Sequence, residues 1–89
     1  MAITLDYPVT VEGDEYSVLK MRRPKVRDMK AAEKASGSEA ETETMLFANL
    51  CEVPPAVIDE LDMHDYGKVQ EQYRDFLSAP GKTSGEPAS

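Results

Sequence analysis

The strict alternation of side chains near the N-terminus constrains the fold more than any other feature of this chain. Every second residue is apolar, and the residues between them are polar or proline. The apolar residues are Ile3, Leu5, Tyr7, Val9 and Val11. A period of two places alternate side chains on opposite faces of a β-strand. Residues 3–11 are therefore predicted to form a strand with one apolar face, and Pro8 indicates a sheet edge or a bulge.

A second strand is predicted to return along the first. Residues 12–15 read Glu-Gly-Asp-Glu, which is a turn composition, and residues 16–21 are again rich in strand-forming side chains. An isolated hairpin is only marginally stable in water. The hairpin predicted over residues 3–21 therefore needs helices to cover its apolar face.

Helical signals follow the hairpin. A helix is expected from about Lys25 to Ala35, because glycine at position 37 can end it in the left-handed conformation. Its expected buried stripe comprises Val26, Met29 and Ala32 or Glu33. Ser38 and Glu41 have the spacing of a capping box, which predicts a second helix that ends near Glu52.

The double proline at positions 54 and 55 predicts a corner between helices, because proline is tolerated only in the first turn of a helix. A short helix is expected over residues 55–61, and Asp62 is the predicted N-cap of a last helix. The apolar stripe of that last helix comprises Met63, Tyr66, Val69, Tyr73, Phe76 and Leu77. The acidic residues within positions 50–66, including Asp65, are expected to be mostly caps or solvent-facing.

These elements predict an α+β fold, with an N-terminal β-hairpin followed by three to four short helices. Eighty-nine residues allow one small domain, which we expect over residues 1–78. Residues 79–89 contain no large apolar side chain, so a disordered C-terminal tail is expected there.

Charge and cysteine content narrow the class of protein. The net charge of −7 disfavours nucleic acids and anionic membranes as partners. A single cysteine cannot form an intramolecular disulfide, which favours a reducing compartment. The N-terminus shows neither the basic nor the apolar region of a signal peptide, and no apolar run approaches a membrane span. We therefore expect a cytoplasmic protein.

Side chains suited to catalysis or metal binding are sparse. His64 is the only histidine and is interpreted as a solvated residue of a first helical turn, and Cys51 as a core thiol. The acidic residues around His64 do not have the spacing of a calcium loop, and no paired Cys or His spacing indicates zinc. The sequence therefore predicts no catalytic residues, no metal site and no cofactor.

A nucleic-acid-binding role is the main chemical alternative. Residues 20–30 read KMRRPKVRDMK, with six basic side chains and one acidic one. Such a stretch can hold phosphate. The acidic second half of the chain and the lack of interleaved aromatic residues favour a surface strip that pairs with carboxylates instead.

Apolar surface left over in so small a domain points to protein binding. The candidate partner-binding residues are Leu61, Tyr66, Val69, Tyr73, Phe76 and Leu77.

The order of these features resembles the small phage tail assembly chaperones of the Mu-like type. The similarity spans about residues 3–78 and is carried by three features: the N-terminal strand pair, the basic helix start Arg22-Arg23-Pro24-Lys25, and a PP..I..LD..DY string. In this chain the string comprises Pro54-Pro55, Ile58, Leu61-Asp62 and Asp65-Tyr66.

The resemblance implies a non-structural, non-catalytic protein of the host bacterial cytoplasm. Such a protein binds the tape measure protein in multiple copies and helps recruit tail tube subunits. The alternative from another class is a small acidic adaptor or inhibitor of a bacterial protein. A chaperone keeps the tape measure protein soluble, whereas an adaptor does not.

Overall fold

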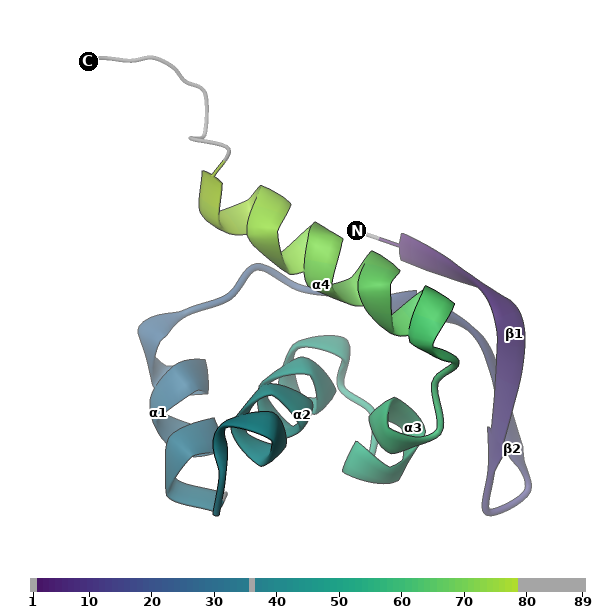
Figure 1. Cartoon of the computed structure of the whole chain (residues 1–89), viewed down its shortest axis with the longest axis horizontal. Coiled ribbons are helices and arrows are strands. Elements are labelled where there is room, and N and C mark those ends of the chain that lie inside the picture. The colour runs from purple at the N-terminus through teal and green to yellow at the C-terminus, as the bar shows by residue number, and fades with distance from the viewer. Residues whose placement is uncertain (1, 36, 79–89) are drawn as a thin grey trace.

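A β-hairpin and four helices make up the computed structural model, which describes residues 2–35 and 37–78 (Figure 1). The elements are β1 (Ala2–Val11), β2 (Asp14–Lys20), α1 (Val26–Ala35), α2 (Glu39–Cys51), α3 (Pro55–Asp59) and α4 (Met63–Ser78). The predicted α+β class, with its N-terminal hairpin, is confirmed. The tail predicted over residues 79–89 lies outside the described residues.

The hairpin closes through a two-residue loop, shorter than the predicted turn over residues 12–15. Glu12 and Gly13 both have positive φ, at 51° and 84°, as the tight hairpin turns that match strand twist require. The antiparallel register pairs Ile3 with Leu19 and Val9 with Tyr16.

Strand β1 carries a pronounced irregularity in its middle. Thr4 pairs with Val18 and Val9 pairs with Tyr16, so residues 5–8 of β1 lie opposite Ser17 alone. Pro8 indicated a sheet edge or a bulge, and it lies in such an irregularity, in a sheet of only two strands. An irregularity of this kind interrupts the alternation of side chains. Tyr7, which was predicted to face the core, is instead 57% exposed. That prediction is wrong because strict alternation requires a regular strand.

Helix α2 supplies the largest share of the core. Its buried residues are Leu46, Phe47, Ala48, Leu50 and Cys51, so the prediction of a core thiol is confirmed. The hairpin contributes Ile3, Leu5, Val9 and Leu19. Helix α3 adds Val57 and Ile58, and α4 adds Val69. Figure 1 shows α2 beneath α4, with α1 on one side and the hairpin on the other.

The predicted caps are present. Ser38 Oγ accepts a hydrogen bond from the Glu41 amide at 3.2 Å, and Asp62 Oδ2 accepts one from the His64 amide at 2.9 Å. The Glu41 carboxylate reaches back one residue further than the capping box predicts, to the amide of Gly37 at 2.9 Å. Pro55 opens α3, as the proline corner requires.

The predicted apolar stripes of α1 and α4 are present in part, because Ala32 and Val69 are buried and four further stripe residues are partly buried: Met29, Tyr66, Tyr73 and Phe76. In α1 the buried positions are Asp28 and Ala32, and in α4 they are Asp65 and Val69. Val26 and Met63, predicted to face the core, are therefore 73% and 80% exposed. In each helix an aspartate and an apolar residue four positions later share the inner face.

Candidate functional site

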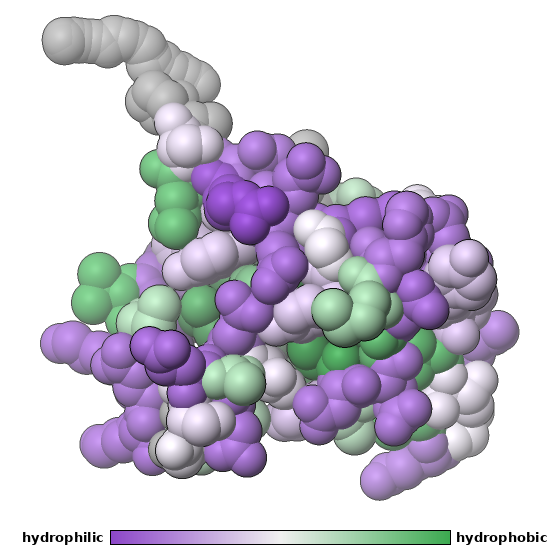
Figure 2. All heavy atoms as spheres, in the orientation of Figure 1, coloured by the Kyte–Doolittle hydropathy of each residue, from purple (hydrophilic) through white to green (hydrophobic). Residues whose placement is uncertain are grey.

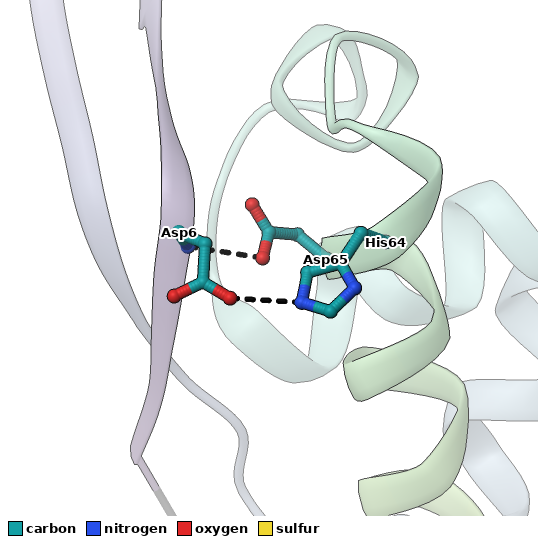
Figure 3. A group of neighbouring side chains, drawn as sticks. All are labelled: Asp6, His64 and Asp65. Carbon is teal, nitrogen blue, oxygen red and sulfur yellow. Dashed lines mark hydrogen bonds and ion pairs between the residues drawn. The ribbon is translucent and has the colours of Figure 1, made fainter.

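The first candidate site is a polar cluster where the start of α4 meets the bulge of β1 (Figure 3). Asp65 has no exposed surface, which corrects the expectation that it faces solvent. Its carboxylate accepts hydrogen bonds from the amides of Asp6, at 3.0 Å, and Tyr7, at 2.9 Å. The bulge removes these amides from regular strand pairing, and the carboxylate satisfies them.

Charged side chains complete this cluster. Asp6 Oδ2 lies 2.8 Å from His64 Nε2 and 2.8 Å from Lys68 Nζ, and Lys68 also donates to the carbonyl of Thr4 at 2.9 Å. His64 is exposed and lies in the first turn of α4, as predicted, but its contact with Asp6 could not be seen in the sequence.

The electrostatics of the cluster favour ionised carboxylates. Burial alone would raise the pKa of Asp65, but the two amide donors and Lys68 outweigh it and the pKa is lowered. Hydrogen bonds from Lys68 and His64 lower the pKa of Asp6. The same contact with Asp6 raises the pKa of Lys68.

Asp6, His64 and Asp65 bring three possible metal-ligating atoms within 4.8 Å of one another. Lys68 Nζ already lies 2.8 Å from Asp6 and 3.6 Å from Asp65. An ammonium group at that position neutralises the carboxylates that a cation would need. The side chains of this cluster therefore favour a structural role, in which they join β1 to α4, over metal binding.

A second buried aspartate, Asp28, likewise joins two segments of the chain through hydrogen bonds, at the start of α1. Asp28 accepts two hydrogen bonds of 2.8 Å from the Arg22 guanidinium and one of 2.9 Å from the Lys25 amide. The paired guanidinium lowers the pKa of Asp28 to about 2, and the Asp28 contact raises that of Arg22. The link between β2 and α1 is thereby held against the first turn of α1.

Two arginines of the basic stretch over residues 20–30 make contacts within the molecule. Arg22 pairs with Asp28 and lies 3.6 Å from Glu52, and its amide donates to the Leu50 carbonyl at 3.0 Å. The Arg23 guanidinium lies over the Phe76 ring, 5.8 Å from its centroid. These contacts favour the interpretation of the stretch as a strip that pairs internally.

The predicted partner-binding residues differ in exposure. Leu61 and Val69 are buried, and Tyr66, Tyr73 and Phe76 are partly buried against the core, whereas Leu77 is 64% exposed. Leu61 and Val69 therefore have little or no surface for a partner in this structure. Contact through the remaining four stays a prediction.

An aromatic cluster holds α4 against α2, from Tyr66 near the start of α4 to Tyr73 in its later part. The Phe47 ring meets Tyr66 and Tyr73 edge-on, with centroids 5.8 Å and 5.5 Å apart. The Tyr66 hydroxyl donates to Glu43, which also accepts a 3.1 Å hydrogen bond from Gln70. Burial and the contact with Glu43 raise the pKa of Tyr66, so the phenol stays protonated.

A groove between α1, α2 and α4 is the second candidate site. We call it the acidic groove, and its lining residues are Met29, Glu33, Glu39, Thr42, Glu43, Leu46 and Tyr73. Met29, Leu46 and Tyr73 supply apolar surface, and three glutamates supply negative charge. Figure 2 shows hydrophobic side chains between the end of α4 and α1, bordered by hydrophilic ones.

Other features offer little for catalysis. Burial raises the pKa of the Cys51 thiol to about 11, which suppresses the nucleophilic thiolate.

None of the helices within residues 2–35 and 37–78 has the length and apolar character to cross a membrane.

A hairpin covered by short helices, with structural polar contacts and the acidic groove, defines a small α+β domain. Residues 2–78 match the sequence model of a protein family. The description of that family is phage tail assembly chaperone proteins, E, or 41 or 14. The chain belongs to this family. No curated protein and no solved structure gives a significant match.

The family match confirms the resemblance that the strand pair and the proline string indicated. It assigns the chain a general role in tail assembly and implies interaction with phage tail proteins.

Proposed function

We propose that this protein is a cytoplasmic, non-catalytic chaperone that binds the tape measure protein and helps recruit tail tube subunits. The observation that supports the proposal best is the family match over residues 2–78, which covers all six elements. A tape measure protein is long and helical, and helices associate through apolar faces. The partly exposed apolar residues of α1 and α4 are suited to such a client.

Multiple copies on one client are part of the proposal. A chain of 89 residues covers only a short part of a long helix. The charge of −7 on each copy keeps a crowded complex soluble through repulsion between exposed surfaces.

Co-expression with the tape measure protein of the same phage tests this function. The tape measure protein should be insoluble alone and soluble with the chaperone, and the two should co-purify in a ratio well above one copy per client. A client that stays insoluble, with no co-purification, would contradict the proposal and favour the acidic adaptor.

A parallel test addresses nucleic acid. Gel-shift assays at low salt should show no binding, and binding that is lost in an Arg23→Ala/Arg27→Ala variant would instead favour a nucleic-acid-binding regulator.

A further inference from the structure

We infer that the acidic groove is the docking site for an amphipathic helix whose apolar side chains are flanked by Lys or Arg. This inference rests on the proposed function, because it takes the tape measure protein as the source of that helix. It assigns a surface and a charge preference to the interaction.

The first argument is the apolar content of the groove. Met29 and Tyr73 line it from opposite helices and remain partly exposed, with buried Leu46 between α1 and α4 on α2. Exposed Val26 lies one turn before Met29 on α1, and exposed Leu77 lies one turn after Tyr73 on α4. The apolar surface therefore extends beyond the groove along both flanking helices, as a helical partner requires.

The second argument is charge. Glu33 and Glu39 are exposed at the groove, and Glu43 is partly exposed there. The carboxylates come from two helices, α1 and α2, and lie beside the apolar surface of the groove. Negative charge beside an apolar floor favours a partner with basic residues next to its apolar stripe.

The third argument excludes an occupant from the chain itself. Residues 79–89 follow α4 directly, but they contain no large apolar side chain and only one basic one, Lys82. They lack the residues that would fill a groove floored by Met29, Leu46 and Tyr73.

A charge-reversal variant tests the inference. Glu33→Lys/Glu39→Lys changes two exposed carboxylates at the groove, and Glu15→Lys/Glu71→Lys makes the same change in charge at exposed positions outside its lining. The probe is the tape measure protein co-expressed with each variant and then titrated as soluble fragments. We expect the groove variant to bind at least about tenfold more weakly, and the control to bind within about twofold of wild type.

An apolar variant gives an independent readout. Leu77→Asp alters an exposed side chain beside the groove, so it should leave the unfolding midpoint nearly unchanged and still weaken binding. Circular dichroism of each variant establishes that it is folded before binding is measured.

The possible outcomes separate the inference from the proposed function. Wild-type protein that fails to bind any fragment contradicts the proposed function. Wild-type binding that is equally strong in the folded groove and Leu77→Asp variants overturns the inference and leaves the function intact. Equal weakening in the groove and control variants would show that net charge alone drives binding, and would also overturn the inference.

Discussion

The two ends of α4 are held to the rest of the molecule by different forces. At its start, Asp65 and Lys68 bind backbone groups of β1 through hydrogen bonds of 2.9–3.0 Å. Towards its end, Tyr73 packs on Phe47 and Phe76 lies under Arg23, without such backbone contacts among the described residues. Directional polar contacts join the start of α4 to β1, whereas the later part of α4 relies on apolar packing and leaves Leu77 exposed.

Removing the aromatic support of α4 should have the largest effect. Phe47 has no exposed surface, and Phe47→Ala would leave a cavity beneath Tyr66 and Tyr73. We expect a loss of about 4 kcal/mol in the free energy of unfolding, measured by urea denaturation. For a domain of this size such a loss leaves the chain largely unfolded. A loss below about 1 kcal/mol would mean that the aromatic cluster does not support α4.

Removing the Asp65 carboxylate at the start of α4 should have the second-largest effect on the free energy of unfolding. Asp65→Ala leaves the amides of Asp6 and Tyr7 without their acceptor, and we expect a loss of about 3 kcal/mol in unfolding free energy. Asp65→Asn keeps one acceptor oxygen and should lose less.

The exposed Asp75 of the same helix offers the control, since Asp75→Ala should change little. Hydrogen exchange should show the start of α4 and β1 opening first in Asp65→Ala. Equal opening along all of α4 would remove the distinction between its two ends.

Acid should weaken the polar contacts of the buried aspartates Asp28 and Asp65, which we call the polar anchors, and should leave the aromatic packing unchanged. Asp28 has a folded-state pKa of about 2 against an ordinary value of 3.8, so its ionised form stabilises the fold above pH 3.8. That contribution, about 2 kcal/mol, is lost as the pH falls from 3.8 towards 2. Urea unfolding at a series of pH values should show this loss in the wild type and a smaller one in Asp28→Asn. Identical pH dependence in both would contradict the assignment.

The smallest effect is expected at the exposed end of α4. Leu77→Ser should change the free energy of unfolding by less than about 0.5 kcal/mol, because this side chain is 64% exposed. Val69→Ala, on the buried side of the same helix, provides the contrast and should cost several times more. Thermal unfolding of both variants compares them, and equal losses would indicate that Leu77 is packed in solution.

Local features of the fold could be predicted from the sequence because their causes are local. The N-terminal strand, the Ser38 cap and the proline corner each depend on residues within a short segment, and each is present. The family resemblance rests on the same kind of short-range signal.

The polar anchors could not be predicted because their partners are distant in the sequence. Asp65 binds amides that lie 59 and 58 positions away. One signal was available: Asp28 and Asp65 each precede a core residue by four positions on a helix, so they share its inner face. Asp65 is instead expected from the sequence to be a cap or solvent-facing, which holds for the neighbouring Asp62 but not for Asp65.

The bulge in β1 has a consequence for how copies of the protein behave when crowded. An open strand edge is a template on which a neighbouring chain can add a strand, and so begin a fibrous aggregate. Lys68 and Asp65 occupy the carbonyl of Thr4 and the amides of Asp6 and Tyr7, and Pro8 has no amide hydrogen to offer. A second hairpin therefore finds no continuous row of donors and acceptors along this part of β1. When copies of the protein come close together, this part of β1 is therefore a poor template for an added strand.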